Sequence, residues 1–278
     1  MVKSLVSQRN LYIRAANHRL FAQRIEPKSK LSVTPPLTLV FLHEGLGSIA
    51  QWRDFPARLS IATGLPALVY ERWGYGNSDI LDMPRTIRYL HDEAFVSLPE
   101  VLQQSDITHA ILVGHSDGGS IALMFAAMHG DNIRGVITEA AHVFVEDVTI
   151  TGIRKAVELY ETTDLRNRLH QYHKDNTDSM FRGWAHTWLS KEFRNWNIEE
   201  YLPRITCPLL VLQGAQDEYG TQAQVDSIVS QAAGPAQGLM IPDCGHVPHH
   251  QAQERVLEEM TKFINGVEGS SEMHRKNS

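Results

Sequence analysis

The sequence predicts an α/β protein built on a mostly parallel central sheet that is flanked by helices. One observation is a series of short, continuously apolar runs, which are typical of strands buried on both faces. These runs are 37–42, 67–70, 110–113, 135–138 and 209–212. The other observation is the helical spacing of apolar residues between several of these runs, as in 95–102. Buried strands that alternate with helices indicate a parallel sheet covered on both faces.

The two ends of the chain are predicted to complete this sheet. Residues 11–13 and 20–22 alternate like half-buried strands, and the segment 16–18 between them is typical of a turn. We therefore expect an antiparallel strand pair before the first buried run. Near the other end, a late strand is expected at 238–241 and a final helix at 251–264.

The alternation of strands and helices stops between residues 142 and 202. This stretch has helical spacing, many charges and three of the five Trp residues, and it contains no convincing strand. About 60 residues is long for a connection inside a compact domain. We therefore predict an α/β core formed by residues 1–141 and 203–278, with residues 142–202 as a helical cap insertion.

Composition excludes several classes of protein. The 278 residues carry 26 Lys and Arg against 32 Asp and Glu, a formal charge of −6, without the basic patch that nucleic-acid binding requires. No apolar stretch is long enough to span a membrane, and the first ten residues do not resemble a signal peptide. The two Cys residues form neither a disulfide framework nor a zinc motif. We expect a cytoplasmic protein with a small-molecule partner; the sequence does not predict its oligomeric state.

The segment 114–119, Gly-His-Ser-Asp-Gly-Gly, lies between a buried strand and a helix. It has the G-x-S-x-G pattern of a nucleophile elbow, in which small residues two before and two after the Ser prevent clashes in a tight turn. The pattern selects Ser116 as nucleophile. With Asp117 as nucleophile, His115 would occupy a position that must be small. A phosphate-binding loop would need a Lys that is absent here.

A Ser hydroxyl needs a base, and the base needs an orienting acid. The best candidate base is His246, in a loop between the late strand and the final helix; His249 and His250 are rivals that we expect on a solvated face. The best candidate acid is Asp217, after the strand 209–212, with Glu218 as its rival. The chain order Ser, Asp, His is the order expected for this elbow class.

With these motifs, the chain resembles α/β-hydrolase-fold serine hydrolases over about residues 10–265. Residues 42–47 resemble the oxyanion loop of that family, and residues 71–78 resemble its D-x-x-G-x-G-x-S loop. Glu44 and Glu71 depart from the pattern, because the family usually has Gly and Asp there. The resemblance implies a helical cap and an oxyanion hole.

The resemblance places the two oxyanion donors at the backbone N–H groups of Gly45 and Asp117, with Leu46 as the alternative to Gly45. Two candidate substrate-binding residues lie in the oxyanion loop, and three have an aromatic ring suited to a pocket wall. They are Glu44, Leu46, Trp52, Trp184 and Trp188.

Neither a cofactor nor a metal is expected. The Gly-Tyr-Gly segment 74–76 is too short to indicate a dinucleotide site. His170 and His173 are three residues apart and could face one way on a helix, but no third ligand is near them in sequence. We expect both on a solvated helix face.

The sequence therefore predicts a serine hydrolase that cleaves a small carboxylic ester, lactone or thioester through an acyl-enzyme. A C–C bond hydrolase of ring-cleavage products and an enol-lactone hydrolase are alternatives on the same fold. A ligand-binding receptor or sensor with little turnover is an alternative of another class.

Overall fold

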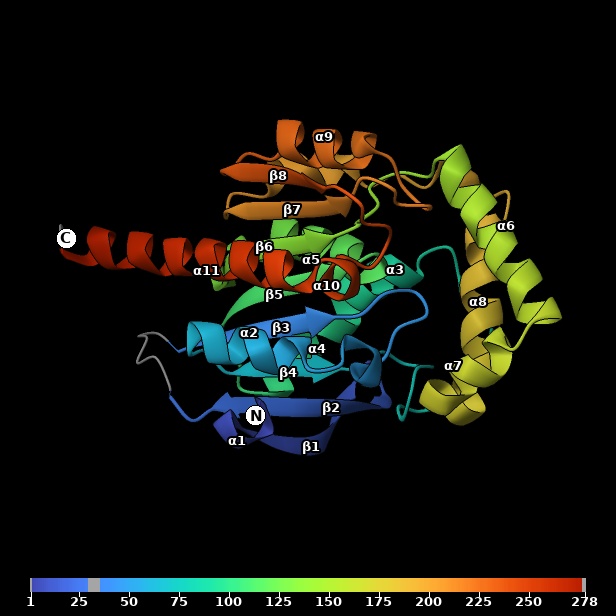
Figure 1. Cartoon of the computed structure of the whole chain (residues 1–278), viewed down its shortest axis with the longest axis horizontal. Helices are drawn as coiled ribbons and strands as arrows, with labels where there is room; N and C mark the ends of the chain where they lie inside the picture. The colour runs from blue at the N-terminus through green and yellow to red at the C-terminus, as the bar shows by residue number, and fades with distance from the viewer. Residues whose placement is uncertain (1, 30–35, 277–278) are drawn as a thin grey trace.

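The computed structural model describes residues 2–29 and 36–276, which form an eight-stranded sheet with helices on both faces (Figure 1). The order of strands across the sheet is β1-β2-β4-β3-β5-β6-β7-β8. The pairs β1–β2 and β2–β4 are antiparallel, and all other neighbours are parallel. The strands are β1 Val6–Ala15, β2 His18–Pro27, β3 Leu37–Leu42, β4 Ala67–Tyr70, β5 His109–His115, β6 Ile133–Glu139, β7 Leu209–Gly214 and β8 Ala236–Ile241. The predicted α/β-hydrolase fold, with a mostly parallel sheet, is confirmed.

Every residue of β3 is buried because successive side chains enter two different hydrophobic clusters. Leu39 and Phe41 belong to the cluster under α2 and α11, whereas Val40 and Leu42 belong to the cluster that includes α4 and α5. A strand with period two that is covered on both faces is therefore apolar at almost every position, and Thr38 is the one polar residue of β3. This explains why the central strands read as continuous apolar runs.

The strand pair at the N-terminus forms as predicted. β1 and β2 pair from Val6 opposite Pro27 to Ala15 opposite His18. Ala16 and Asn17 turn the chain, with φ of 49° and 65°. Two left-handed residues match the right-handed twist of the flanking strands, as in a type I′ hairpin turn.

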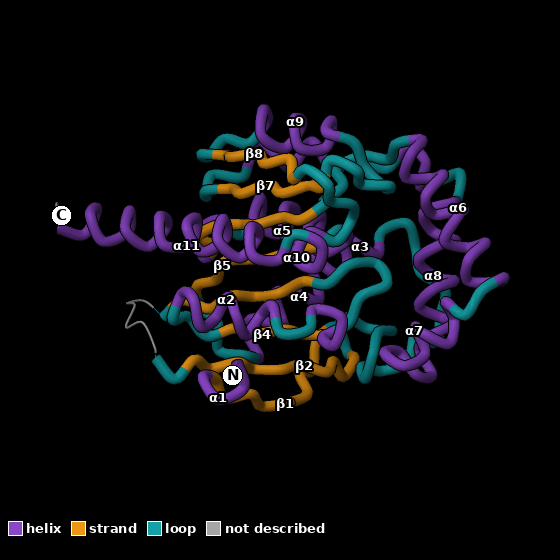
Figure 2. Tube along the Cα trace, viewed as in Figure 1, coloured by secondary structure: helices purple, strands orange, loops and turns teal. Residues whose placement is uncertain are grey.

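Helices cover both faces of the sheet and stand beyond its carboxyl edge (Figure 2). The α-helices are α1 Val2–Leu5, α2 Phe55–Thr63, α3 Tyr89–Asp92, α4 Leu98–Gln104, α5 Asp117–Met128, α6 Asp147–Thr162, α7 Leu165–His173, α8 Thr177–Leu189, α9 Gln222–Gln231, α10 Pro248–Gln251 and α11 Gln253–Lys276. The π-helix is η2 Glu93–Ser97, and the 3₁₀ turns are η1 Ile49–Trp52, η3 Gly130–Asn132, η4 Lys174–Asn176, η5 Phe193–Asn195 and η6 Glu199–Arg204. None of these described helices is both long and apolar enough to cross a membrane.

The segment 142–202 lies between β6 and β7 and is helical, and its helices α6, α7 and α8 stack beyond the sheet (Figure 1). Its own aromatic contacts hold it together: the rings of Tyr160 and Phe181 stack at 3.7 Å, and those of Phe193 and Trp196 stack at 5.2 Å. Among the described residues, its extended pairing is one bridge between Phe144 and Asn197. The division of the chain into a core and a cap stays a prediction.

Candidate active site

The turn between β5 and α5 places Ser116 at the carboxyl edge of the sheet. Ser116 has φ of 52° and ψ of −116°, a strained conformation for a residue with a Cβ. The turn is so tight that a Cβ on Gly114 would overlap the backbone of Gly118, and a Cβ on Gly118 would overlap the carbonyl of Leu42. The small residues of the elbow are therefore required by close backbone packing on both sides of Ser116.

Asp217 and His246 meet at the same edge, because both follow parallel strands. Oδ1 of Asp217 lies 2.9 Å from Nδ1 of His246, and it also accepts a hydrogen bond from the backbone N–H of Tyr219 at 2.8 Å. Burial alone would raise the pKa of Asp217. The charge of His246 and the hydrogen bonds from His246 and from the backbone of Tyr219 outweigh burial and leave the pKa lowered. Burial would lower the pKa of His246, but Asp217 leaves it raised. These shifts favour the ionised carboxylate of Asp217. The hydrogen bond to Asp217 fixes the His246 imidazole in the tautomer that carries its proton on Nδ1.

Ser116 and His246 line one small cavity of about 40 Å³, which has room for only a few water molecules. The other residues around it come from the loop after β3, the start of α5, the segment 142–202 and the loop after β7. They are Glu44, Gly45, Leu46, Asp117, His142, Thr149, Ile153, Trp184, Trp188 and Tyr219. The cavity brings together the residues predicted for the nucleophile, the base and the oxyanion hole.

The peptide group that joins Glu44 to Gly45 is held in place by hydrogen bonds to its carbonyl oxygen, which belongs to Glu44. The Glu44 oxygen accepts from Nη2 of Arg72 at 2.8 Å and lies 2.7 Å from Nδ1 of His43. His43 accepts the backbone N–H of Arg72 at Nε2, so its Nδ1 carries the proton and donates. In a trans peptide the N–H points opposite to the C=O. The N–H of Gly45 is therefore directed away from Arg72.

The start of α5 is fixed by the same guanidinium. Oδ2 of Asp117 accepts from Nη2 of Arg72 at 3.3 Å and from the hydroxyl of Tyr89 at 2.8 Å. Tyr89 in turn accepts from Nε1 of Trp188 at 2.7 Å. Arg72 thus connects both loops that carry the candidate oxyanion donors, and Tyr89 extends the connection to α8.

The segment 142–202 also holds the loop after β3, through His173. Nδ1 of His173 accepts the backbone N–H of Gly76 at 3.1 Å, and Nε2 donates to the carbonyl of Leu46 at 2.9 Å. Burial lowers the pKa of His173 to about 4, so the ring stays neutral at neutral pH. The prediction of a solvated face is wrong for His173, because these two backbone partners satisfy a buried ring; His170 is exposed as expected.

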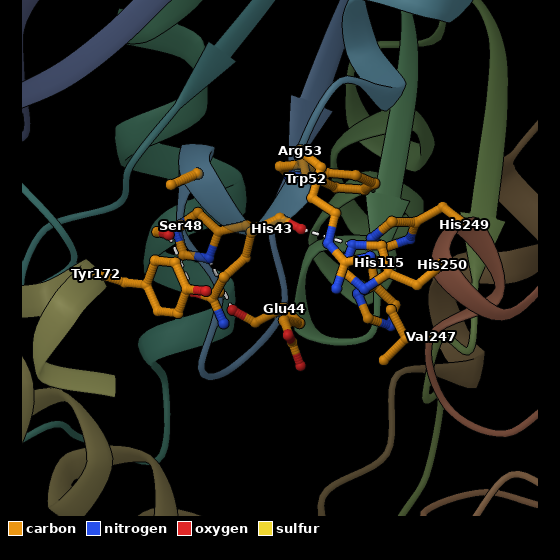
Figure 3. Close-up of a pocket in the computed structure, with 13 residues that line it drawn as sticks. His43, Glu44, Ser48, Trp52, Arg53, His115, Tyr172, Val247, His249 and His250 are labelled. Carbon is orange, nitrogen blue, oxygen red and sulfur yellow. Dashed lines mark hydrogen bonds between the residues drawn. The ribbon is translucent and has the colours of Figure 1, made fainter. Parts of the chain in front are cut away.

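Four of the predicted substrate-binding residues line the cavity of Ser116, and Trp52 does not; the four are Glu44, Leu46, Trp184 and Trp188. Trp52 is buried against Phe41 and His249, and it lines a second cavity of about 260 Å³ (Figure 3). Trp52 lies outside the cavity of Ser116 because the loop after β3 turns its side chain into the core, and its role in substrate binding stays a prediction.

The two rival candidates for the base, His249 and His250, form hydrogen bonds with other parts of the chain. His249 is buried, and Oε2 of Glu139 accepts from its backbone N–H at 2.9 Å and lies 3.0 Å from its Nδ1. His250 donates from Nε2 to the carbonyl of Gln51 at 2.8 Å. Neither ring lines the cavity of Ser116. The predicted solvated face is wrong for His249, because Glu139 provides a buried partner.

Sequence reasoning missed Arg72, Tyr89, His142 and Tyr219. Arg72 had one sequence signal, since a cation two residues after the buried strand 67–70 lies at the carboxyl edge where ligands bind. Tyr219 follows the candidate acid by two residues. Tyr89 and His142 carried no signal, because their positions depend on contacts across the fold.

The fold and the site together are those of an α/β hydrolase, and comparison with known proteins agrees. Residues 39–259 match the alpha/beta hydrolase family. A proline iminopeptidase of Saccharolobus solfataricus is 23% identical over 269 residues, which cover 82% of this chain and 85% of that protein. The chain therefore belongs to the alpha/beta hydrolase family.

Solved structures show the same fold. The proline iminopeptidase of Mycobacterium smegmatis matches with a TM-score of 0.73 at 18% identity, covering 95% of this chain and 100% of that chain. The enol-lactonase from Burkholderia xenovorans LB400 matches with a TM-score of 0.70 at 19% identity, covering 92% and 100%. At such identities these structures establish the fold, and their different activities leave the substrate open.

The close packing of the elbow predicts that adding one methyl group will strongly destabilise the fold. Gly118→Ala would place a Cβ against the carbonyl of Leu42 at the end of β3, and we expect a loss of about 3 kcal/mol in the free energy of unfolding. Gly266→Ala is the matched control, because no atom lies within 4 Å of the added Cβ on α11. Urea unfolding of both variants checks this; equal stabilities would contradict the close packing of the elbow.

Proposed function

We propose that this protein hydrolyses a small carboxylic ester, or a related lactone or thioester, through an acyl-enzyme on Ser116. The observation that carries the proposal is the hydrogen-bonded Asp217–His246 pair, which shares one small cavity with Ser116 on its strained elbow. In this arrangement a base is fixed in one tautomer next to an otherwise weak nucleophile.

The reaction begins when Nε2 of His246 takes the proton of the Ser116 hydroxyl as its oxygen attacks the substrate carbonyl. Asp217 holds the other ring nitrogen and stabilises the imidazolium that forms. The backbone N–H groups of Gly45 and Asp117 donate to the oxyanion of the tetrahedral intermediate. His246 then protonates the leaving alcohol. Water, deprotonated by the same ring, cleaves the acyl-enzyme and releases the acid.

The cap segment would select the substrate. The cavity of about 40 Å³ holds only a few waters, so we expect α8 or the loops around it to move when an ester binds. Trp184 and Trp188 form its cap wall and supply an apolar, aromatic surface. A small acyl group packed between these rings and the elbow fits this wall best.

Turnover of p-nitrophenyl esters with graded acyl length tests the nucleophile. We expect hydrolysis by the wild type that is lost in Ser116→Ala, since without the hydroxyl no acyl-enzyme forms. The chain-length optimum measures the acyl pocket. Turnover that survives in Ser116→Ala would contradict the mechanism. A folded wild type that cleaves no ester would favour C–C bond hydrolysis or a binding role instead.

The acid of the triad can be assigned by a matched pair of variants. Asp217→Asn keeps the shape but removes the carboxylate that orients His246, and we expect kcat to fall by about 10⁴. Glu218→Gln is the control: its carboxylate accepts only the backbone N–H of His246, at 3.3 Å, and we expect a change of less than about tenfold. The reverse order of the two losses would transfer the role to Glu218.

The pH dependence follows from the charges around the base. His246 must be neutral to act, and although burial lowers its pKa, Asp217 and Glu44 help to raise it above 6.5 overall. We expect kcat/KM to rise with pH and to level off above this raised pKa. Glu44→Gln removes one raising charge, so the inflection should move to lower pH, whereas Glu258→Gln on the far, exposed face of α11 should not move it.

A flat profile of kcat/KM between pH 5 and 8 would argue against His246 as the base. An inflection that stays in place in Glu44→Gln would show that the Glu44 carboxylate does not act on the ring.

A further inference from the structure

Glu44 brings a carboxylate into the site at the position where the family usually has Gly. Its side chain is half-buried, and within residues 2–29 and 36–276 it has no hydrogen-bond or ion-pair partner. It lines both the cavity of Ser116 and the second cavity, where it lies across from Trp52 (Figure 3). A partly buried carboxylate without a partner is the kind of group that a ligand satisfies.

Two imidazoles face this carboxylate. One carboxylate oxygen of Glu44 and one ring nitrogen each of His115 and His246 lie within 4.8 Å of one another, the one such group of three among the described residues. Three atoms so spaced share a centre within about 2.8 Å (4.8/√3) of each, against about 2.0–2.2 Å for zinc bonds to His and Glu. Each of the three ligand atoms would therefore move toward the common centre by less than about 1 Å to bind the ion.

Each imidazole has one nitrogen engaged and one lone pair left. Nε2 of His115 donates to the carbonyl of His246 at 2.7 Å, which leaves the lone pair on Nδ1. Nδ1 of His246 donates to Asp217, which leaves the lone pair on Nε2. Metal-bound histidines commonly donate their other N–H to a carboxylate or a backbone carbonyl in this way. Both imidazoles therefore have the outer partners of a metal ligand.

We propose that Glu44, His115 and His246 bind one Zn²⁺ ion, and that the bound ion inhibits the enzyme. Two imidazoles and one carboxylate are a zinc ligand set that leaves a fourth position open toward the cavity. The ion would occupy the lone pair on Nε2 that otherwise takes the proton of Ser116. Zinc binding and nucleophile activation therefore exclude each other; the inhibition rests on the proposed function, whereas the binding does not.

Calorimetric titration with ZnCl₂ tests the binding. We expect one ion per chain for the wild type and affinity at least about tenfold weaker in Glu44→Gln, which keeps the size of the side chain but removes the charged ligand. His115→Asn should weaken binding as well. Glu218→Gln is the matched control, because it removes a neighbouring negative charge that is not among the three ligands. Circular dichroism confirms that each variant is folded.

The rate at which a fluorophosphonate probe labels Ser116 tests the inhibition without an ester substrate. We expect ZnCl₂ to slow labelling of the wild type at least tenfold, EDTA to restore it, and Glu44→Gln to lose most of the effect. Zinc affinity that is equal in the wild type and Glu44→Gln would overturn the proposal, since the 14 His residues of the chain offer other sites. Labelling unaffected by bound zinc would overturn the inhibition. A wild type that is never labelled would contradict the proposed function alone, and the titration would still decide the zinc site.

Discussion

The buried guanidinium of Arg72 is the interaction on which the geometry of the site depends. It has no exposed surface, and a buried charge needs an opposite charge and hydrogen-bond acceptors, which here meet its Nη2. Burial would lower the pKa of Arg72, but Tyr75 and Asp117 leave it raised, so the group stays charged. The chain must therefore bring carbonyls and a carboxylate to Arg72, and these belong to the two loops beside Ser116. A single cation behind the site thus fixes the direction of both candidate oxyanion donors in front of it.

The same network makes the cap segment part of the site rather than a cover placed over it. Trp188 reaches Asp117 through the hydroxyl of Tyr89, and His173 holds the carbonyl of Leu46. Opening the cavity by moving α7 or α8 would stretch hydrogen bonds that position the oxyanion loop and the start of α5. Since the cavity holds only a few waters, the hydrolysis we propose requires an opened state for substrate entry, and closure would restore the donors around the substrate. On this proposal, substrate selection and assembly of the oxyanion hole are one event.

The parts of the site that the sequence could predict are those set by local geometry or by chain order. The elbow around Ser116 requires small residues at fixed spacing, and Asp217 and His246 follow strands whose carboxyl ends share one edge. Arg72 and Tyr89 were missed because their partners lie 28 or more residues away in sequence and no local pattern records such contacts. The errors at His173 and His249 have the same cause. Composition predicts whether a side chain is polar, but burial depends on partners such as Glu139 that only the tertiary fold supplies.

Glu44 gives this site a property that the triad alone does not have. A carboxylate beside the oxyanion loop opposes the negative charge that develops there, so a Gly at this position would serve simple ester hydrolysis better. What the carboxylate does favour is positive charge: it raises the pKa of His246, and together with His115 it completes a set of metal ligands. A proton, the hydroxyl of Ser116 and a zinc ion all compete for the one lone pair on Nε2 of His246. Because protons and zinc displace each other from that lone pair, control of activity by metal and control by pH have the same physical origin.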